Sequence, residues 1–326
     1  MPAVDSHTQE KLEFERIRQL LARHAHCALG RSLAERIQPS RRVSQVTGWL
    51  KQARQFEQWV DQHGIPPFGG IRDVRKQVRR AVPPAKLEPE EFADLAATLS
   101  GVEVLREHFA DRTDKLDLIA KVTNRIGDLR VITGRITRVI DPRGKVRDEA
   151  SDRLSRLRDE IAQVRQAART VFDKLLKQPS VVKYLQYPNA TFHADRMVLP
   201  LKADQRGRLP GIVHRSSDTG QTLFVEPAEA VEINNRRINL MQSEQEEINR
   251  ILWELTHLVH LNQKEILHSL DATAVIDLMT AKLKLAQNYH MHLPEINERN
   301  RLKLIQARNP ILMEIHEGDE NQAATN

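Results

Sequence analysis

Two stretches of heptad-spaced residues constrain the fold of this 326-residue chain more than any other feature. In each stretch the marked positions are separated alternately by three and four residues, the spacing of the a and d positions of a coiled coil. The first stretch carries Leu154, Leu157, Ile161, Val164, Ala168, Val171 and Leu175, and the second carries Ile238, Met241, Gln245, Ile248, Leu252, Leu255 and Val259. Because one helix cannot bury so narrow a stripe alone, the pattern predicts a long antiparallel arm of roughly 33 Å, with Gln245 fixing its register.

The segment between the two stretches predicts a small antiparallel β-sheet. Short runs rich in Val, Leu and Phe are separated there by Gly, Pro and Asp, as in 196–202, 211–215 and 220–227. The expected fold is therefore mostly α, with a helical core and a long antiparallel coiled-coil arm that carries the small antiparallel sheet at its tip.

The remaining sequence predicts helices and places the domain boundaries. Helices are expected from Leu12 to about Gly30, through 46–63, over 71–82 and over 87–109, with Ser151 as the N-cap of the first long helix. We also expect a hairpin within 131–140 and a strand at 302–305. The expected domains are a helical core over 1–140, an arm over 141–270 with its β insert at about 180–227, a return helix and strand over 271–313, and a disordered tail over 314–326.

Composition favours a cytoplasmic protein with a mild preference for polyanions. The net charge is +6, aromatic residues make up 4%, and Cys27 is the single cysteine. No apolar run reaches the roughly 18 residues of a membrane span, and the polar first ten residues contain no signal-peptide core. We therefore expect no membrane partner and no internal disulfide.

The β insert carries the first group of candidate nucleic-acid-binding residues. Residues 177–226 hold seven cations against four acids. Lysine and arginine in a loop can reach phosphates without constraints from a core, although a solvated basic loop has the same composition. The candidate contacts are Lys183, Arg196, Lys202, Arg206, Arg208, His214 and Arg215.

A second basic group lies on one face of a predicted helix. Residues 41–80 hold nine cations against three acids. On a helical wheel the stripe faces away from Ile71, Val74 and Val78, so it either binds a phosphate backbone or pairs with acids elsewhere. The stripe consists of Arg72, Arg75, Lys76, Arg79 and Arg80.

Other candidate sites have little support. The pairs His24/His26 and His290/His292 have i, i+2 spacing, which points to different faces of a helix and does not suit a metal. The chain contains no Gly-x-Ser-x-Gly elbow and no Gly-x-x-x-x-Gly-Lys-[Ser/Thr] loop. We therefore expect no catalytic residue, no metal and no cofactor in this chain.

Several segments resemble the second MutS subfamily. The specific ones are Arg196-Met-Val-Leu-Pro-Leu-Lys202, Gly211-Ile-Val-His214 and Gly220-Gln-Thr-Leu-Phe-Val-Glu-Pro227. Segments 12–14, 68–73, 148–154 and 307–312 also fit, so the resemblance covers essentially the whole chain. The sequence departs from the family at Asn309, where a histidine is usual, and in lacking the phosphate-binding loop.

The resemblance implies the core, lever and clamp of a protein that grips nucleic acid. In the full-length family protein it further implies an ATPase that uses ATP and Mg, often a nuclease, and a homodimer, so this chain is expected to stop at the edge of the ATPase region. Implied partners are branched or structured DNA, in recombination control or mismatch-repair-like processes, or ribosomal RNA on stalled ribosomes. The residues leave the choice between DNA and RNA open. A structural coiled-coil module that binds other proteins remains the alternative.

Overall fold

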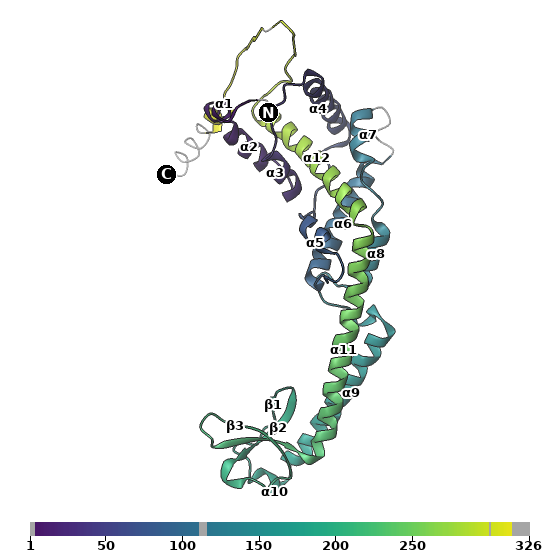
Figure 1. Ribbon diagram of the computed structural model, residues 1–326, viewed down its shortest axis with the longest axis vertical. Helices are drawn as coiled ribbons and strands as arrows, with labels where there is room; N and C mark the ends of the chain where they lie inside the picture. Colours follow the sequence, from purple (N-terminus) through teal and green to yellow (C-terminus); the bar gives the residue numbers. More distant parts are fainter. Residues whose placement is uncertain (1–3, 111–115, 300, 315–326) are drawn as a thin grey trace. The chain divides into compact units, whose positions relative to one another are not determined.

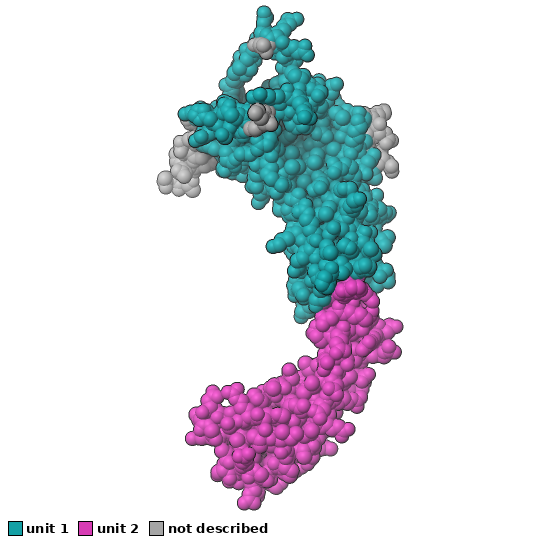
Figure 2. Space-filling model, in the orientation of Figure 1, with its two compact units in different colours: residues 1–145, 255–326 teal, residues 146–254 magenta. Residues whose placement is uncertain are grey.

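The computed structural model describes residues 4–110, 116–299 and 301–314, and the chain divides into two compact units. Figure 1 shows the order of the elements, and Figure 2 shows unit 1, residues 1–145 and 255–326, in teal and unit 2, residues 146–254, in magenta. The fold is mostly helical with one small antiparallel sheet, which confirms the predicted class at that level.

Unit 1 contains only helices among its described residues. They are α1 (Ser6–Lys11), α2 (Phe14–Arg23), α3 (Ala28–Ala34), α4 (Val43–His63), α5 (Arg75–Arg80), α6 (Pro89–Phe109), α7 (Asp117–Thr123), α8 (Arg130–Val139), the end of α11 (Ala228–Leu261), and α12 (Gln263–Asn288). The predicted end of α4 is confirmed, because Gly64 follows it with a φ of 80°.

Helix α12 is the centre of unit 1. It packs against α2, α3, α4, α5, α6 and α7. Its Asp277 is fully buried and accepts the backbone N–H groups of His26 and Cys27, each at 2.9 Å, at the start of α3. A Cβ on Gly30 would lie 2.2 Å from the Asp277 carboxylate, so only glycine admits this approach. The α3–α12 contact therefore depends on one buried acid and one glycine.

Three predictions in unit 1 are wrong in detail. Instead of a hairpin within 131–140, residues Arg130–Val139 form α8, because Ile132, Ile136 and Ile140 are buried at a spacing of four, which is helical. The expected strand at 302–305 is absent from the described chain; Leu302 is 86% exposed and pairs with no other segment. The first expected helix, from Leu12 to about Gly30, is divided into α2 and α3, while α1 ends before Leu12 and is separated from α2 by Glu13, which has a φ of 50°.

The C-terminal part of the chain is described up to Glu314. Of the predicted tail, 314–326, only Glu314 lies within the described residues, and its carboxylate pairs with Arg23. The second long helix ends at Leu261, and α12 begins after the single residue Asn262, whose side-chain amide donates to the Leu258 carbonyl at 2.8 Å.

Unit 2 contains α9 (Asp152–Leu176) and the first part of α11, which run antiparallel. Arg158 pairs with Glu244 at 2.8 Å, and Glu160 lies 3.8 Å from Arg236. The residue number of the partner on α11 therefore decreases as the residue number on α9 increases, which shows that the helices are antiparallel. Ser151 is the N-cap of α9, as predicted. The heptad residues of α9 are largely buried, namely Leu154, Ile161, Val164, Ala168 and Leu175.

The buried polar residue of α11 that contacts α9 is Glu247, and Gln245 does not have the predicted role. Gln245 is exposed and contacts only Asn249 on its own helix, at 3.4 Å. Glu247 is 2% exposed and accepts the Ser151 hydroxyl at 2.7 Å. Hydrogen bonds from Arg250, which outweigh the effect of burial, lower the pKa of Glu247 to about 2. The hydrogen bond from Ser151 to the Glu247 carboxylate therefore joins α11 to the N-terminus of α9.

The sheet of unit 2 consists of the strands β1 (Thr191–His193), β2 (Arg196–Lys202), β3 (Gly211–Ser216) and β4 (Thr222–Pro227). Their order in the sheet is β1-β2-β4-β3, and every pairing is antiparallel. The unit also contains the short helix α10 (Pro179–Val182) and two 3₁₀ turns, η1 (Asp148–Ala150) and η2 (Ala203–Gln205). One hydrophobic cluster joins Phe172 and Leu175 at the end of α9 to Leu199, Leu201 and Val225 of the sheet. The sheet is thus packed onto the end of α9.

Within the described ranges, none of the helices combines the length and the apolar character that crossing a membrane requires.

Candidate nucleic-acid interface

The loop between β2 and β3 presents two unpaired arginines. Arg206 and Arg208 are exposed, and neither makes an ion pair with a residue that the structure describes. Gly207 stands between them with a φ of 83°, a conformation that favours glycine. Leu209 is 9% exposed and packs into the hydrophobic cluster of the sheet. The loop is therefore anchored by Leu209 while both guanidinium groups stay in solvent.

Two lysines lie close together where the end of β2 meets the residue after α10. The Lys202 ammonium is 3.5 Å from the backbone carbonyl of Lys183. The Lys183 ammonium lies 4.8 Å from the centre of the Tyr184 ring, a cation–π distance. Neither lysine has a carboxylate partner among the described residues. They add to the positive charge next to the loop.

Strand β3 forms one edge of the sheet, and all six of its residues are exposed. Ile212 and Val213 are 48% and 41% exposed, so the edge is partly apolar. The register shifts between Val213 and Arg215, a bulge that discourages pairing with another strand. Arg215 is exposed and pairs with Asp218 at 2.9 Å, a surface pair that costs little to break.

Arg196 and His214 lie differently, because both contact the buried carboxylate of Glu226. Glu226 is 0% exposed and accepts Arg196 at 2.8 Å and the His214 Nε2–H at 2.6 Å. Asn234 on α11 donates to the same carboxylate at 2.8 Å. Burial raises the pKa of Glu226, but these hydrogen bonds outweigh it and hold the pKa below its ordinary value. The two side chains therefore brace the sheet from within.

The same network ties the sheet to α11. The Asn234 side chain bonds both the N–H and the carbonyl of Met197, at 3.2 and 3.0 Å. Arg196 also donates to Asn235 at 2.8 Å, and Arg237 lies 5.0 Å from the centre of the Phe192 ring. Neither Glu226 nor Asn234 is among the site residues predicted from the sequence. The available signal was an acid at the end of the otherwise apolar run 223–225.

The basic stripe of unit 1 is largely neutralised. Arg72 pairs with Asp94, Arg80 with Glu91, and Arg75 with Asp73 at 2.6 Å. Only Lys76 and Arg79 are exposed without an ion pair to a described residue. Three of the five cations in the stripe are therefore engaged in ion pairs, two with acids of α6 and one with Asp73 and Asp271.

Comparisons with known proteins give one consistent result. No protein-family model matches the chain. It is 32% identical over 304 residues to endonuclease MutS2 of a Geobacillus species, a match that covers 92% of this chain and 39% of that protein. It is 31% identical over 318 residues to endonuclease MutS2 of Geobacillus thermodenitrificans, which covers 97% of this chain and 40% of that protein.

A third relative extends the pattern to another genus. Endonuclease MutS2 of Brevibacillus brevis is 33% identical over 303 residues, which covers 92% of this chain and 39% of that protein. The chain thus spans about two fifths of the length of the curated relatives it matches. The three matches cover 92 to 97% of this chain, in agreement with the resemblance to the second MutS subfamily predicted from its sequence. Over the part of those proteins that it spans, this chain belongs to the MutS2 family, the second MutS subfamily.

Proposed function

We propose that this chain grips the phosphate backbone of structured nucleic acid through the sheet of unit 2. The observation that carries the proposal is the anchored loop of residues 203–210, from which Arg206 and Arg208 extend without an acidic partner. Lys202, Lys183 and Arg215 supply further charge at its sides. Backbone contacts of this kind bind without reading sequence.

The paired helices α9 and α11 serve in this proposal as a coiled-coil arm. The ion pairs between the two helices show that they run antiparallel, and the buried residues of α9 follow the heptad spacing. The arm carries the sheet as a clamp, and the bonds of Glu226 and Asn234 make the sheet move with α11. Arg196 and His214 act as braces in this account, and the phosphate contacts are left to the exposed cations.

The relatives are named endonucleases, which makes nucleic acid the favoured partner of this chain as well. Branched DNA in recombination control and ribosomal RNA on stalled ribosomes both offer a structured phosphate backbone. ATP, Mg and homodimer formation belong, in this proposal, to the full-length family protein. The sequence of 326 residues contains no Gly-x-x-x-x-Gly-Lys-[Ser/Thr] loop, so no residue here is assigned to ATP.

Charge reversal tests the proposal. Arg206→Glu with Arg208→Glu should weaken binding of a synthetic four-way DNA junction by about tenfold or more at low salt, measured by fluorescence anisotropy. An RNA hairpin titrated in parallel shows which nucleic acid binds more tightly. The matched control is Arg165→Glu with Arg169→Glu, two exposed α9 arginines that make no ion pair with described residues. Equal affinities of the loop variant and the unaltered protein would refute the proposal.

A further inference from the structure

A basic segment that the sequence analysis did not single out surrounds α8 in unit 1. Residues 121–145 contain seven cations against two acids. All seven are exposed. They are Lys121, Arg125, Arg130, Arg135, Arg138, Arg143 and Lys145. The density of positive charge here exceeds that of the β insert.

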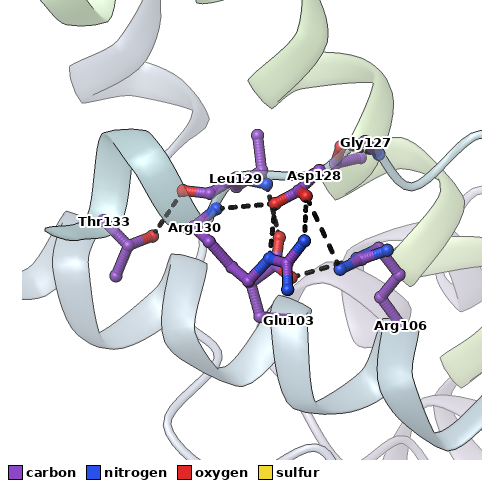
Figure 3. Close-up of polar contacts among 8 residues, drawn as sticks. Glu103, Arg106, Gly127, Asp128, Leu129, Arg130 and Thr133 are labelled. Atoms are coloured by element: carbon purple, nitrogen blue, oxygen red, sulfur yellow. Dashed lines mark hydrogen bonds and ion pairs between the residues drawn. The ribbon is translucent and has the colours of Figure 1, made fainter.

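Both acids of the segment are engaged locally. Asp128 accepts the backbone N–H and the guanidinium of Arg130 and lies 4.0 Å from Arg106 (Figure 3). Asp141 accepts the backbone N–H groups of Arg143 and Lys145, at 2.9 and 2.8 Å, and so closes the turn after α8. Neither acid forms an ion pair with Arg135, Arg138, Arg143 or Lys145, and these four cations pair with no other residue in the described ranges.

The start of α8 is held rigidly. Figure 3 shows Glu103 of α6 beneath the turn at residues 127–130. The Glu103 carboxylate is 7% exposed; it accepts the Leu129 backbone N–H and pairs with Arg106 at 3.0 Å. The hydroxyl of Thr133 donates to the Leu129 carbonyl at 2.9 Å. The helix is thus fixed to α6 by its first turn, and its outer face is presented in one orientation.

The outer face of α8 combines two arginines with a glycine and an exposed valine. Val131, Gly134, Arg135 and Arg138 follow i, i+3, i+4, i+7 spacing and so share one face, and all are exposed. Val131 is 74% exposed. We name these four residues the α8 basic face.

Gly134 is the second, independent observation. A Cβ at this position would meet no atom within 4 Å, so packing inside the chain does not require glycine. Glycine in an exposed helix interior costs about 1 kcal/mol relative to alanine. Favourable interaction with the helix dipole explains cations in the last turn, but it does not explain a glycine and an exposed valine beside them. A partner that approaches the helix backbone closely would account for both.

We infer that the α8 basic face is a second nucleic-acid contact, on unit 1, which binds the phosphate backbone of a duplex. Ten helical residues extend roughly 15 Å, the length of about four phosphates along one strand. Arg135 and Arg138, which both follow Gly134 in the helix, would contact phosphates next to the point where the duplex backbone lies closest to α8. Arg143 and Lys145 continue the positive charge past the end of α8. This contact is separate from the loop of residues 203–210 and does not depend on it.

The test is a charge reversal in the full chain. Arg135→Glu with Arg138→Glu should weaken binding of a short DNA duplex by about tenfold at low salt, as measured by anisotropy. A matching RNA duplex decides whether B-form or A-form geometry is preferred. The control is Lys51→Glu with Arg54→Glu on α4, an exposed pair with the same i, i+3 spacing and no ion pair to described residues. It should change affinity less than twofold.

A second variant separates binding from folding. Gly134→Gln improves helix propensity and should raise the melting temperature, yet its side chain should weaken duplex binding several-fold. Higher stability with unchanged affinity would contradict the close approach.

The outcomes separate this inference from the proposed function. Unchanged affinity in the Arg135/Arg138 variant, with loss in the Arg206/Arg208 variant, overturns the inference and leaves the clamp proposal standing. The reverse pattern supports the α8 face and refutes the clamp. Soluble polyglutamate is a further probe. If it binds the unaltered protein as tightly as the duplex does, and if Arg135→Glu with Arg138→Glu abolishes that binding, then the face binds acidic proteins and the inference is overturned.

Discussion

Glu226 shows how a single residue sets the roles of its neighbours. Its carboxylate has no solvent exposure, so it must be neutralised by hydrogen bonds from inside the protein. Arg196, His214 and Asn234 supply them. Two residues that the sequence suggested as phosphate contacts are therefore engaged with an acid that the sequence analysis had not connected to them. Arg206 and Arg208 form no ion pair with a described residue, so their charge stays exposed to solvent.

Replacement of Glu226 should destabilise the protein in a pH-dependent way. The pKa of Glu226 is lowered in the folded state, so its charge contributes stability above the ordinary value of 4.5 and loses that contribution as the pH falls below it. Glu226→Gln should cost about 2 kcal/mol or more at neutral pH, because Arg196 stays partly buried without its charged partner. The melting temperatures of Glu226→Gln and of the unaltered protein, measured at pH 7 and at pH 3, test this expectation. A gap in melting temperature that stays constant over this range would contradict the account.

At the scale of the element, spacing decided which predictions succeeded. The heptad residues of α9 and the glycine after α4 are local signals, and the structure confirms the helices they predict. In contrast, β-branched residues in 131–140 suit a strand or a helix, and only the packing of Ile132 and Ile136 beneath the helix decides between them. Gln245 lies on the heptad pattern but is exposed, whereas Glu247, two residues further along, contacts Ser151 at the start of α9.

Nonlocal pairing explains what the sequence left open. Arg72 and Arg80 pair with Asp94 and Glu91 of α6, which lie 22 and 11 residues further along the chain. Glu226 meets Arg196 across the sheet, thirty residues away in the chain. Charge counts along the sequence cannot show such pairs. A count over residues 121–145 would nevertheless have found the positive charge around α8, which the predicted hairpin obscured.

The N-cap of α9 gives an element-scale prediction. Ser151→Ala removes the hydrogen bond to the Leu154 N–H, at 3.0 Å, and the contact with Glu247. The free energy of unfolding should decrease by about 1 to 2 kcal/mol in urea denaturation. Ser155→Ala, one turn further along the same helix, is the control and should leave stability unchanged or slightly higher. Similar losses from both substitutions would mean that the cap does not hold the helix.

At the scale of the whole molecule, charge is distributed over two separate units. Unit 2 presents the loop of residues 203–210, and unit 1 presents the α8 basic face. In unit 2 the loop belongs to a sheet whose bonds to Asn234 and Asn235 tie it to α11. Any rotation of α11 should therefore carry the loop with it.

The salt dependence of binding tests the clamp proposal most directly. The logarithm of the association constant for a DNA junction should decrease linearly with the logarithm of salt concentration. Arg206→Gln with Arg208→Gln should make that slope shallower by roughly 1.8, because two phosphate contacts each contribute about 0.9. The neutral pair Arg165→Gln with Arg169→Gln should leave it unchanged. An identical slope for the loop variant and the unaltered protein would contradict the claim that this loop contacts phosphates.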